Sequence, residues 1–420
     1  MRVLIVNTSE RTGGAAVAAH RLTEALINNG VKAKMMVMEK QTDNLYVVDY
    51  HHYFRDQWNF LWERFVIWVH NLFSRRNLFK VSIANTGRDI TKTREFREAD
   101  IIHLHWINQG FLSLRSIRKI LASGKPVVWT MHDMWPMTAI CHHAYECDRY
   151  QTSCSHCSFL RFPGPSDLSA SVFKKKKALF EGVPITFVAV SNWLAERARK
   201  SALIGQKDIR VIPNVISLSH FSLIDRTDAR SSLHLPSCHI VTFGAARIDD
   251  SIKGLTTLLK ALQLLVDSGF AKKEEIHLLL FGGVKDGKIL DSVPVPYTYL
   301  GYVNDSYQMS LVYSASNAVV QPSLYETFGQ TLIEALACGC VPVAFGNSGQ
   351  ADIITHRVNG YLADYLSVDS LAEGIRWALE ADVKQSVLRN SVLTRYTESI
   401  VALKYTELYN EAIAQKGYKL

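Results

Sequence analysis

The stretch LYETFGQTLIEALACGCVPVA, Leu324–Ala344, decides how this chain folds. A strand-like segment, residues 317–323, leads into a glycine turn, and the turn is followed by an alanine-rich helix and a short apolar strand at residues 340–346. Strand, helix and strand in this order predict two parallel strands joined by a crossover helix. The turn also has the form of an anion site, yet two carboxylates, Glu326 and Glu334, lie around it.

The same alternation of strands and helices continues along the rest of the chain. Further strands are predicted at residues 2–7, 32–38, 100–106, 125–133, 185–191, 209–215, 239–246, 276–283 and 297–303. Helices are predicted at residues 15–30, 114–123, 192–202, 255–268 and 305–314. This pattern indicates an α/β protein in which helices flank parallel sheets.

A polar, irregular segment, Ser217–Pro236, separates the elements into two series and is interpreted as a linker. We therefore predict two doubly wound, Rossmann-like domains that face each other across a cleft, with the ligand beyond the carboxyl ends of the strands. The first domain is expected over residues 1–216 and the second over residues 237–396. A terminal helix, about residues 397–420, is expected to pack back on the first domain.

Composition and charge narrow the class of protein. The chain has 420 residues, 48% of them hydrophobic, which is enough for two buried cores. It has no long apolar run, and its first residues enter a strand without a signal-peptide pattern, so we expect a cytoplasmic protein. The net charge is +8, and residues 1–180 carry roughly 25 basic and 15 acidic side chains. Such a basic half can attract nucleic acid, an anionic membrane or a phosphorylated acceptor.

The turn of the opening stretch is suited to a phosphate because the first N–H groups of a helix lack partners within that helix. Glu334 lies on the helix, where its carboxylate can accept hydrogen bonds from a pair of sugar hydroxyls, and Glu326 can serve a second sugar. The segment GAARIDDSIKG supplies Arg247 and Lys253, which suit a diphosphate. Taken one at a time, these charges have an alternative reading as ordinary solvated side chains.

The order of these groups resembles a known family. An arginine and a lysine, followed about eighty residues later by a Glu-x7-Glu pair, resemble the retaining glycosyltransferases of family 4, which have the GT-B fold, and in particular those that build bacterial surface polysaccharides. The resemblance covers nearly the whole chain through TGG, VVWTMHD, VAVSNWLAE, VIPNV, IKG, YLGYV, QPSLYETFGQTLIEALACGCVPVA and NGYLA, in that order. It implies that the first domain binds the acceptor and the second a nucleotide sugar.

The resemblance also implies a role for each matching residue of the second domain. Glu326 would hold hydroxyls of the transferred sugar, and Glu334 would bind the ribose. Arg247 and Lys253 would stabilise the leaving diphosphate. The backbone that cradles sugar and diphosphate would be that of Phe328, Gly329, Gln330 and Thr331.

Five further positions match the family. Tyr302 and Val303 would bracket the nucleotide base. In the first domain, Gly13 and Gly14 would approach the donor phosphate and the acceptor, and His132 would reach toward the donor sugar. The alternative for His132 is a hydrogen-bonded histidine at the end of a strand.

The sequence has no Asp-x-Asp pair to hold a metal at the diphosphate, so we expect catalysis without a metal cofactor. The expected partners are a nucleotide-diphosphate sugar and a glycan or lipid-linked acceptor, and no nucleic acid. The resemblance implies that the sugar is transferred with retention of its anomeric configuration. Two other functions remain open: a nucleotide-sugar 2-epimerase of the same fold, and a basic, zinc-containing nucleic-acid-binding protein.

Residues 51–80 are dense in aromatic side chains, and basic residues, Arg64, Arg75, Arg76 and Lys80, are interleaved with them. This segment can lie in a membrane interface, with the protein at the inner face of the membrane. The alternative is an ordinary pair of helices whose aromatic side chains pack on the first domain.

Four cysteines lie within seventeen residues: Cys141, Cys147, Cys154 and Cys157. Four thiolates that include a closing C-x2-C pair can form a tetrahedral structural zinc site. Free thiols and disulfides are the alternatives for this cluster.

Overall fold

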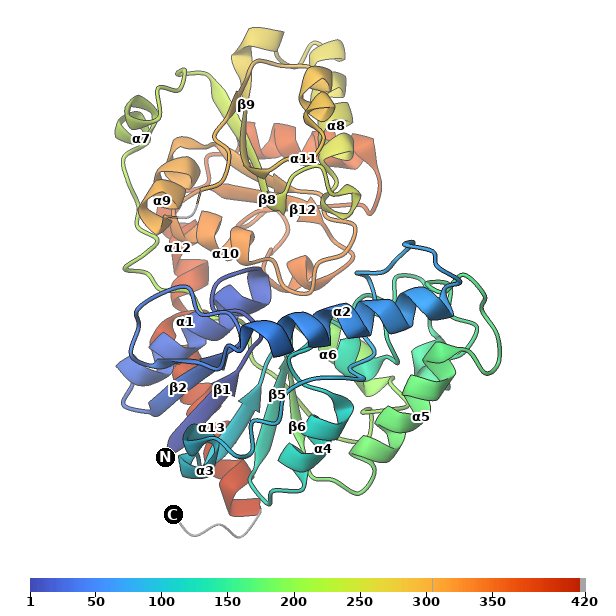
Figure 1. Cartoon of the computed structure of the whole chain (residues 1–420). Helices are drawn as coiled ribbons and strands as arrows, with labels where there is room; N and C mark the ends of the chain where they lie inside the picture. The colour runs from blue at the N-terminus through green and yellow to red at the C-terminus, as the bar shows by residue number, and fades with distance from the viewer. Residues whose placement is uncertain (304, 416–420) are drawn as a thin grey trace. The chain divides into compact units, whose positions relative to one another are not determined.

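The computed structural model describes residues 1–303 and 305–415, and the chain divides into two compact units (Figure 1). The first unit comprises residues 1–215 together with the chain from Val401 onward, and the second comprises residues 216–400. Each unit is built on a parallel sheet with helices around it. The predicted α/β fold of two Rossmann-like domains is therefore confirmed.

The first unit contains, in its described residues, a seven-stranded parallel sheet in the order β3-β2-β1-β4-β5-β6-β7. Its strands are β1 (Arg2–Val6), β2 (Lys32–Val37), β3 (Val47–Asp49), β4 (Ile101–Leu104), β5 (Val127–Met131), β6 (Thr186–Ala189) and β7 (Asp208–Val211). Its helices are α1 (Gly14–Asn28), α2 (Tyr53–His70), α3 (Arg94–Glu98), α4 (Leu114–Leu121), α5 (Leu168–Phe180), α6 (Asn192–Arg199) and the last helix, α13 (Glu398–Gln415). The strand order reverses between β1 and β4, where such sheets bind ligands.

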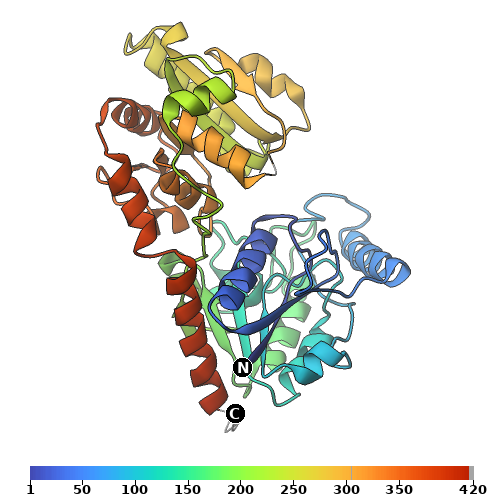
Figure 2. The same ribbon diagram turned by 90° about the vertical axis from the view of Figure 1, so that its left-hand side faces the viewer.

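Helix α13 packs against the core of the first unit and runs along its sheet (Figure 2). The buried side chains of Tyr405 and Tyr409 lie in one apolar cluster with residues of α1, β1 and β2. Their hydroxyls also make polar contacts with the sheet, because Tyr409 Oη lies 2.7 Å from His103 Nδ1 and Tyr405 Oη lies 2.9 Å from Thr130 Oγ1. Apolar burial and these hydrogen bonds together fix the helix on the unit.

The second unit contains, within the described part of the chain, a six-stranded parallel sheet in the order β10-β9-β8-β11-β12-β13. Its strands are β8 (His239–Arg247), β9 (Ile276–Gly283), β10 (Tyr297–Tyr299), β11 (Ala318–Gln321), β12 (Val341–Phe345) and β13 (Tyr361–Ala363). Its helices are α7 (Arg226–Ser232), α8 (Leu255–Asp267), α9 (Ser306–Ala315), α10 (Gln330–Ala337), α11 (Val368–Glu380) and α12 (Gln385–Leu393). Strand β11 pairs in parallel with β12, so the opening stretch forms the predicted strand, helix and strand.

The segment at residues 217–236 differs from a simple linker because it contains α7. Ala229 of this helix is fully buried against Leu311 and Ala315 of α9, so the segment is part of the second unit. Of the helices in residues 1–303 and 305–415, none has the length and apolar character needed to span a bilayer.

Candidate functional site

The loops that follow β8 and β11 meet at the carboxyl edge of the second sheet. The N–H of Leu324 donates to the carbonyl of Ile252 at 2.8 Å. This approach requires glycine at position 254, because a Cβ on Gly254 would lie 2.0 Å from the carbonyl oxygen of Pro322. Gly254 also has a positive φ of 79°, which L side chains rarely adopt. The hydrogen bond therefore joins the two loops, and the absence of a side chain at Gly254 allows them to come this close.

Lys253 and Glu326, which the sequence predicts to serve a diphosphate and a sugar, form an ion pair. Lys253 ends the 3-10 helix η3 (Ser251–Lys253), and its Nζ lies 2.9 Å from Glu326 Oε2. Both side chains are partly accessible, at 29% for Lys253 and 18% for Glu326. The charge of Glu326 is the main cause of a raised pKa at Lys253, so the lysine is a cation at neutral pH. A positive charge is thus held in place beside a carboxylate where solvent still has access.

Helix α10 starts next to this pair. Gly329 precedes the helix with a φ of 109°, and glycine brings no side chain to cap the first N–H groups. The hydroxyl of Thr331 donates to Gln321 Oε1 at 2.7 Å, and Gln350 Nε2 donates to the backbone oxygen of Gln321 at 2.7 Å. The Thr331 bond attaches the start of the helix to the end of β11, and the Gln350 bond attaches the segment after β12 to the same residue. The positive end of the helix dipole is therefore fixed at the carboxyl edge of the sheet.

Glu334 lies in the middle of α10 and is buried, with 7% of its surface exposed. Its Oε2 accepts a hydrogen bond from the hydroxyl of Tyr313 at 3.2 Å. Burial is the main cause, and the neighbouring carboxylate a further cause, of a raised pKa at Tyr313, so its phenol remains a donor at neutral pH. The interpretation of Glu334 as an exposed, solvated helix residue is therefore wrong.

The ion pairs of Arg247 are with residues other than Lys253 and Glu326. Its side chain is half exposed, and its guanidinium faces Asp249 at 3.4 Å and Asp250 at 3.7 Å. Tyr302 is also exposed, and its hydroxyl lies so close to Gly283 that a Cβ there would be 2.0 Å away. The contacts described for the second unit do not connect Val303 to these groups.

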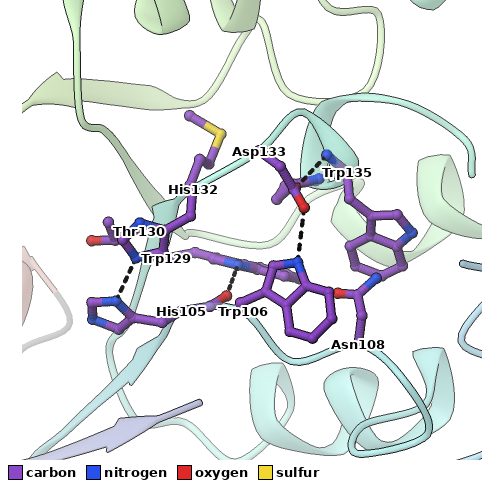
Figure 3. Close-up of a pocket in the computed structure, with 10 residues that line it drawn as sticks. His105, Trp106, Asn108, Trp129, Thr130, His132, Asp133 and Trp135 are labelled. Atoms are coloured by element: carbon purple, nitrogen blue, oxygen red, sulfur yellow. Dashed lines mark hydrogen bonds between the residues drawn. The ribbon is translucent and has the colours of Figure 1, made fainter. Parts of the chain in front are cut away.

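In the first unit, two histidines follow neighbouring strands at the carboxyl edge of the sheet (Figure 3). His105 comes after β4 and His132 after β5, and His105 Nδ1 lies 2.8 Å from His132 Nε2. They line a small pocket in which His105 Nε2 and Asn108 Nδ2 are buried without a hydrogen-bond partner in the described residues. Because its Nε2 is engaged by His105, His132 must exchange that bond before this nitrogen can reach a sugar.

Asp133 organises the other side of the pocket (Figure 3). Its Oδ2 accepts from Trp106 Nε1 at 2.8 Å and lies 2.6 Å from His142 Nδ1, and its Oδ1 accepts from the N–H of Trp135. Burial disfavours the charged carboxylate, but His142, His143 and the N–H of Trp135 outweigh burial and lower the pKa of Asp133 to about 2. The pocket thus combines a fixed negative charge with two neutral histidines.

Gly13 and Gly14 open α1 at the same edge of this sheet. Gly13 has a φ of 90°, and a Cβ built there would meet no atom within 4 Å. The backbone conformation, and not the lack of space, is therefore what favours glycine at this position.

The buried histidines predict a loss of stability in acid. Burial lowers the pKa of His103 to about 3 and of His132 to about 4, and it lowers that of His105 well below 6.5. As the pH falls below 6.5, these histidines bind protons in the unfolded chain but remain unprotonated in the folded chain. Each histidine then removes up to about 1.4 kcal/mol of unfolding free energy per pH unit until the pH reaches its folded-state pKa.

Urea unfolding at a series of pH values from 7 downward measures this slope. His103→Gln should lower the slope by about one proton, since glutamine does not titrate. The matched control is His220→Gln, which changes an exposed histidine and should leave the slope unchanged. An unfolding free energy that stays constant between pH 6.5 and pH 4.5 would contradict the burial of neutral histidines.

None of the four cysteines of the predicted zinc cluster forms a disulfide within the described residues. Burial raises the pKa of Cys154 and Cys157 to about 11 and also raises that of Cys141. The negative charge of other cysteines in the cluster raises each of these three pKa values further. In residues 1–303 and 305–415, no three His, Cys, Asp or Glu side chains are placed to hold a metal ion. The zinc site remains a prediction.

Several groups of the two sites are not among the residues chosen from the sequence. They are His105, Asp133, Tyr313, Gln321 and Gln350. The first two follow apolar strands in the segments HLHW and MHD, so their place after a strand could have marked them. Tyr313 and Gln350 contact the site from distant parts of the chain, and no local pattern shows this.

Comparison with known protein families agrees with the division of the chain. The model described as Glycosyltransferase Family 4 matches residues 12–220, and the model described as Glycosyl transferases group 1 matches residues 225–392. The phosphatidyl-myo-inositol mannosyltransferase of Mycobacterium tuberculosis is 25% identical over 345 residues, which cover 80% of this chain and 79% of that protein. The putative colanic acid biosynthesis glycosyl transferase WcaC of Escherichia coli is 24% identical over 62% of this chain and 63% of that protein.

Solved structures share the fold. The sucrose-phosphate synthase of Thermosynechococcus elongatus superposes with a TM-score of 0.68 and 19% identity, over 99% of both chains. HepE of Anabaena, solved in complex with UDP and glucose, superposes with a TM-score of 0.63 and 14% identity, over 98% of this chain and all of that one. At these identities the superpositions show the two-domain architecture alone.

Proposed function

Since the chain belongs to the glycosyltransferases of family 4 and group 1, we propose that it moves a sugar from a nucleotide-diphosphate donor to a hydroxyl of a glycan or lipid-linked acceptor, with retention. The observation that carries this proposal is the ion pair of Lys253 and Glu326 beside the start of α10. A fixed cation and a helix N-terminus suit a diphosphate, and an accessible carboxylate suits sugar hydroxyls.

The proposed chemistry breaks the bond between the anomeric carbon and the diphosphate oxygen. Negative charge grows on the departing diphosphate, and Lys253, Arg247 and the N-terminus of α10 stabilise it. The acceptor hydroxyl attacks from the face that the diphosphate leaves, and its proton passes to a departing phosphate oxygen. Donor contacts by Glu326 with the sugar and by Glu334 with the ribose would fix the anomeric carbon for this attack.

The first unit would contribute the acceptor side of the reaction. His132 is neutral at pH 7 because burial lowers its pKa to about 4, so it can donate or accept a hydrogen bond but adds no positive charge. It would therefore orient a sugar hydroxyl and leave charge stabilisation to the second unit. Gly13 and Gly14 would allow a close approach of backbone to the ligand.

A thermal-shift screen with UDP-, GDP-, ADP- and dTDP-sugars tests the donor class. A donor present at 100 times its dissociation constant should add about 2.7 kcal/mol to the apparent unfolding free energy. One base is expected to stabilise the protein far more than the others, and Lys253→Ala with Glu334→Ala should lower the shift to well below half of this value. Stabilisation by none of these donors would reject a nucleotide sugar as the substrate.

A further inference from the structure

Helix α2 is amphipathic, but its apolar side faces outward, which is the reverse of the usual arrangement at the surface of a domain. Its outward side carries exposed apolar side chains, whereas the side turned toward the protein carries charged and polar ones. We define the aromatic face as the exposed residues Tyr53, Phe54, Trp58, Leu61, Trp62 and Phe65 of the helix with Leu72 and Phe73 of the following turn. The exposed fraction reaches 78% at Phe54 and 63% at Trp58. The alternative reading, in which these aromatic side chains pack on the domain, is therefore wrong.

Buried polar contacts fix this orientation. Asp56 pairs with Arg88 at 2.8 Å and accepts from the N–H of His52 at 2.6 Å. Glu63 is fully buried, and one of its oxygens accepts from the N–H groups of Ile83 and Ala84 at 2.7 and 2.8 Å. Rolling the helix to bury its aromatic side would leave these charges without partners, which is costly. The aromatic face therefore stays directed outward.

The aromatic rings form a continuous strip along the helix. Trp58 stacks on Trp62 with centroids 5.9 Å apart and an interplanar angle of 11°, and Trp62 stacks on Phe65 at 5.7 Å. The strip continues to Trp68, whose ring centroid lies 6.0 Å from that of Phe65. It ends at Phe73, whose ring centroid lies 4.7 Å from that of Trp68. Helix α2 lies on the opposite side of the first unit from α13, where Figures 1 and 2 show it at the periphery.

The exposed charges of residues 51–80 have one sign. In residues 51–80, all of which the structure describes, the acidic residues are Asp56 and Glu63, and both are buried in the contacts given above. The exposed charged residues of the segment are Arg55, Arg75, Arg76 and Lys80. An apolar strip rimmed by basic side chains is complementary to the anionic surface of a bilayer, and it would repel an identical strip on a second copy.

A neighbouring loop extends the surface with the same composition. Arg161 and Phe162 are exposed, and the guanidinium of Arg161 lies 5.6 Å from the Phe162 ring centroid. The loop is attached to the end of α2, because the N–H of Arg161 donates to Asn71 Oδ1 at 3.1 Å and Asn77 Nδ2 donates to the carbonyl of Phe159 at 3.2 Å. Two separate segments thus present arginine and aromatic side chains on one side of the unit.

From this arrangement we propose that the aromatic face is a docking surface for an anionic lipid bilayer. Helix α2 lies in the plane of the interface, its aromatic side chains enter the boundary between headgroups and acyl chains, and Arg75, Arg76 and Lys80 contact the headgroups. The inference does not rest on the proposed function. If the acceptor is lipid-linked, this surface holds the first unit at the bilayer where that acceptor is found.

Vesicle co-sedimentation of the full chain tests the proposal. The protein should bind vesicles of phosphatidylcholine that contain phosphatidylglycerol far better than vesicles of phosphatidylcholine alone. Replacing Trp58, Trp62 and Phe65 with serine should lower the affinity on the order of 10²-fold, because three interfacial aromatic side chains are lost. Arg75→Ser with Arg76→Ser should lower it roughly 25-fold on anionic vesicles, about a factor of five for each charge.

The matched control replaces two exposed apolar residues elsewhere, Tyr307→Ser and Leu403→Ser, and should bind vesicles like the unchanged protein. Thermal unfolding checks that each variant is folded, which is expected because the replaced side chains are exposed. Equal vesicle binding by the aromatic variant and the control would overturn the proposal. The proposal would also be overturned if the unchanged protein binds no vesicles and self-associates, and the aromatic variant is monomeric. The aromatic face would then be an interface between two copies of the chain.

Discussion

Replacing Lys253 with alanine should lower the turnover number by on the order of 10² to 10³ and weaken nucleotide-sugar binding much less. In the proposed reaction the charge of the diphosphate grows as the glycosidic bond breaks, so a fixed cation would stabilise the transition state more than the bound donor. The ion pair with Glu326 at 2.9 Å holds this cation in place before the donor arrives. Steady-state turnover and the donor dissociation constant, measured on the same preparation, separate the two effects.

The control for this variant is Lys260→Ala, which removes the same charge from the exposed side of α8 and should leave turnover unchanged. The ion pair makes a second reading possible, in which Lys253 acts only by positioning Glu326. In that case Glu326→Ala alone would lower turnover as much as Lys253→Ala, and the double variant would lower it no further. A Lys253→Ala enzyme with normal turnover would remove the lysine from the site altogether.

The sequence predicted most of the sheet because strands buried on both faces are continuous apolar runs. The predicted strand at residues 276–283 coincides with β9, and the predicted helix at residues 255–268 ends one residue after α8. Strands β3 and β13 were not predicted. Each is three residues long and lies at the edge of its sheet, and so short a run has no measurable periodicity.

Helix α2 shows why a pattern alone does not give an orientation. Periodicity distinguishes the aromatic side of the segment from its polar side, but it does not say which side is buried. The usual assumption places the aromatic side inward, and here it fails because Arg88 and the N–H groups of Ile83 and Ala84 provide partners for two buried carboxylates. Those partners lie more than fifteen residues away in the sequence, so only the folded chain reveals them.

The contacts within the candidate site were likewise predictable from the sequence only in part. The sequence predicts a role in the site for Lys253 and Glu326 from their order along the chain, and the structure places the two side chains in contact. Arg247, chosen on the same grounds, instead faces the two aspartates that follow it. Arg247 must exchange its contacts with Asp249 and Asp250 to reach a diphosphate. A sequence motif does not show that these aspartates compete with the diphosphate for the guanidinium.

Replacing Glu334 with alanine should weaken the binding of the nucleoside diphosphate product by about 10- to 100-fold, the cost of one or two hydrogen bonds to a charged group. The proposed ribose contact would exist both before and after transfer, so the loss should appear in product affinity as well as in donor affinity. Glu334→Gln keeps the shape of the buried side chain and should lose less. Tyr313→Phe removes only the hydroxyl that donates to Glu334 and should change product affinity by less than about threefold.

Glu326→Ala provides the opposite pattern, because a residue that holds the transferred sugar makes no contact with the product nucleotide. It should spare product affinity and lower the rate, whereas Glu334→Ala should lower the affinity first. Calorimetric titration of the product into both variants, together with their turnover numbers, distinguishes the two roles. If Glu326→Ala loses product affinity while Glu334→Ala keeps it, the assignment of the two carboxylates is reversed. If both variants bind and turn over normally, the sugar and the ribose are held elsewhere, and the buried pair of Glu334 and Tyr313 serves only to hold α10 against α9.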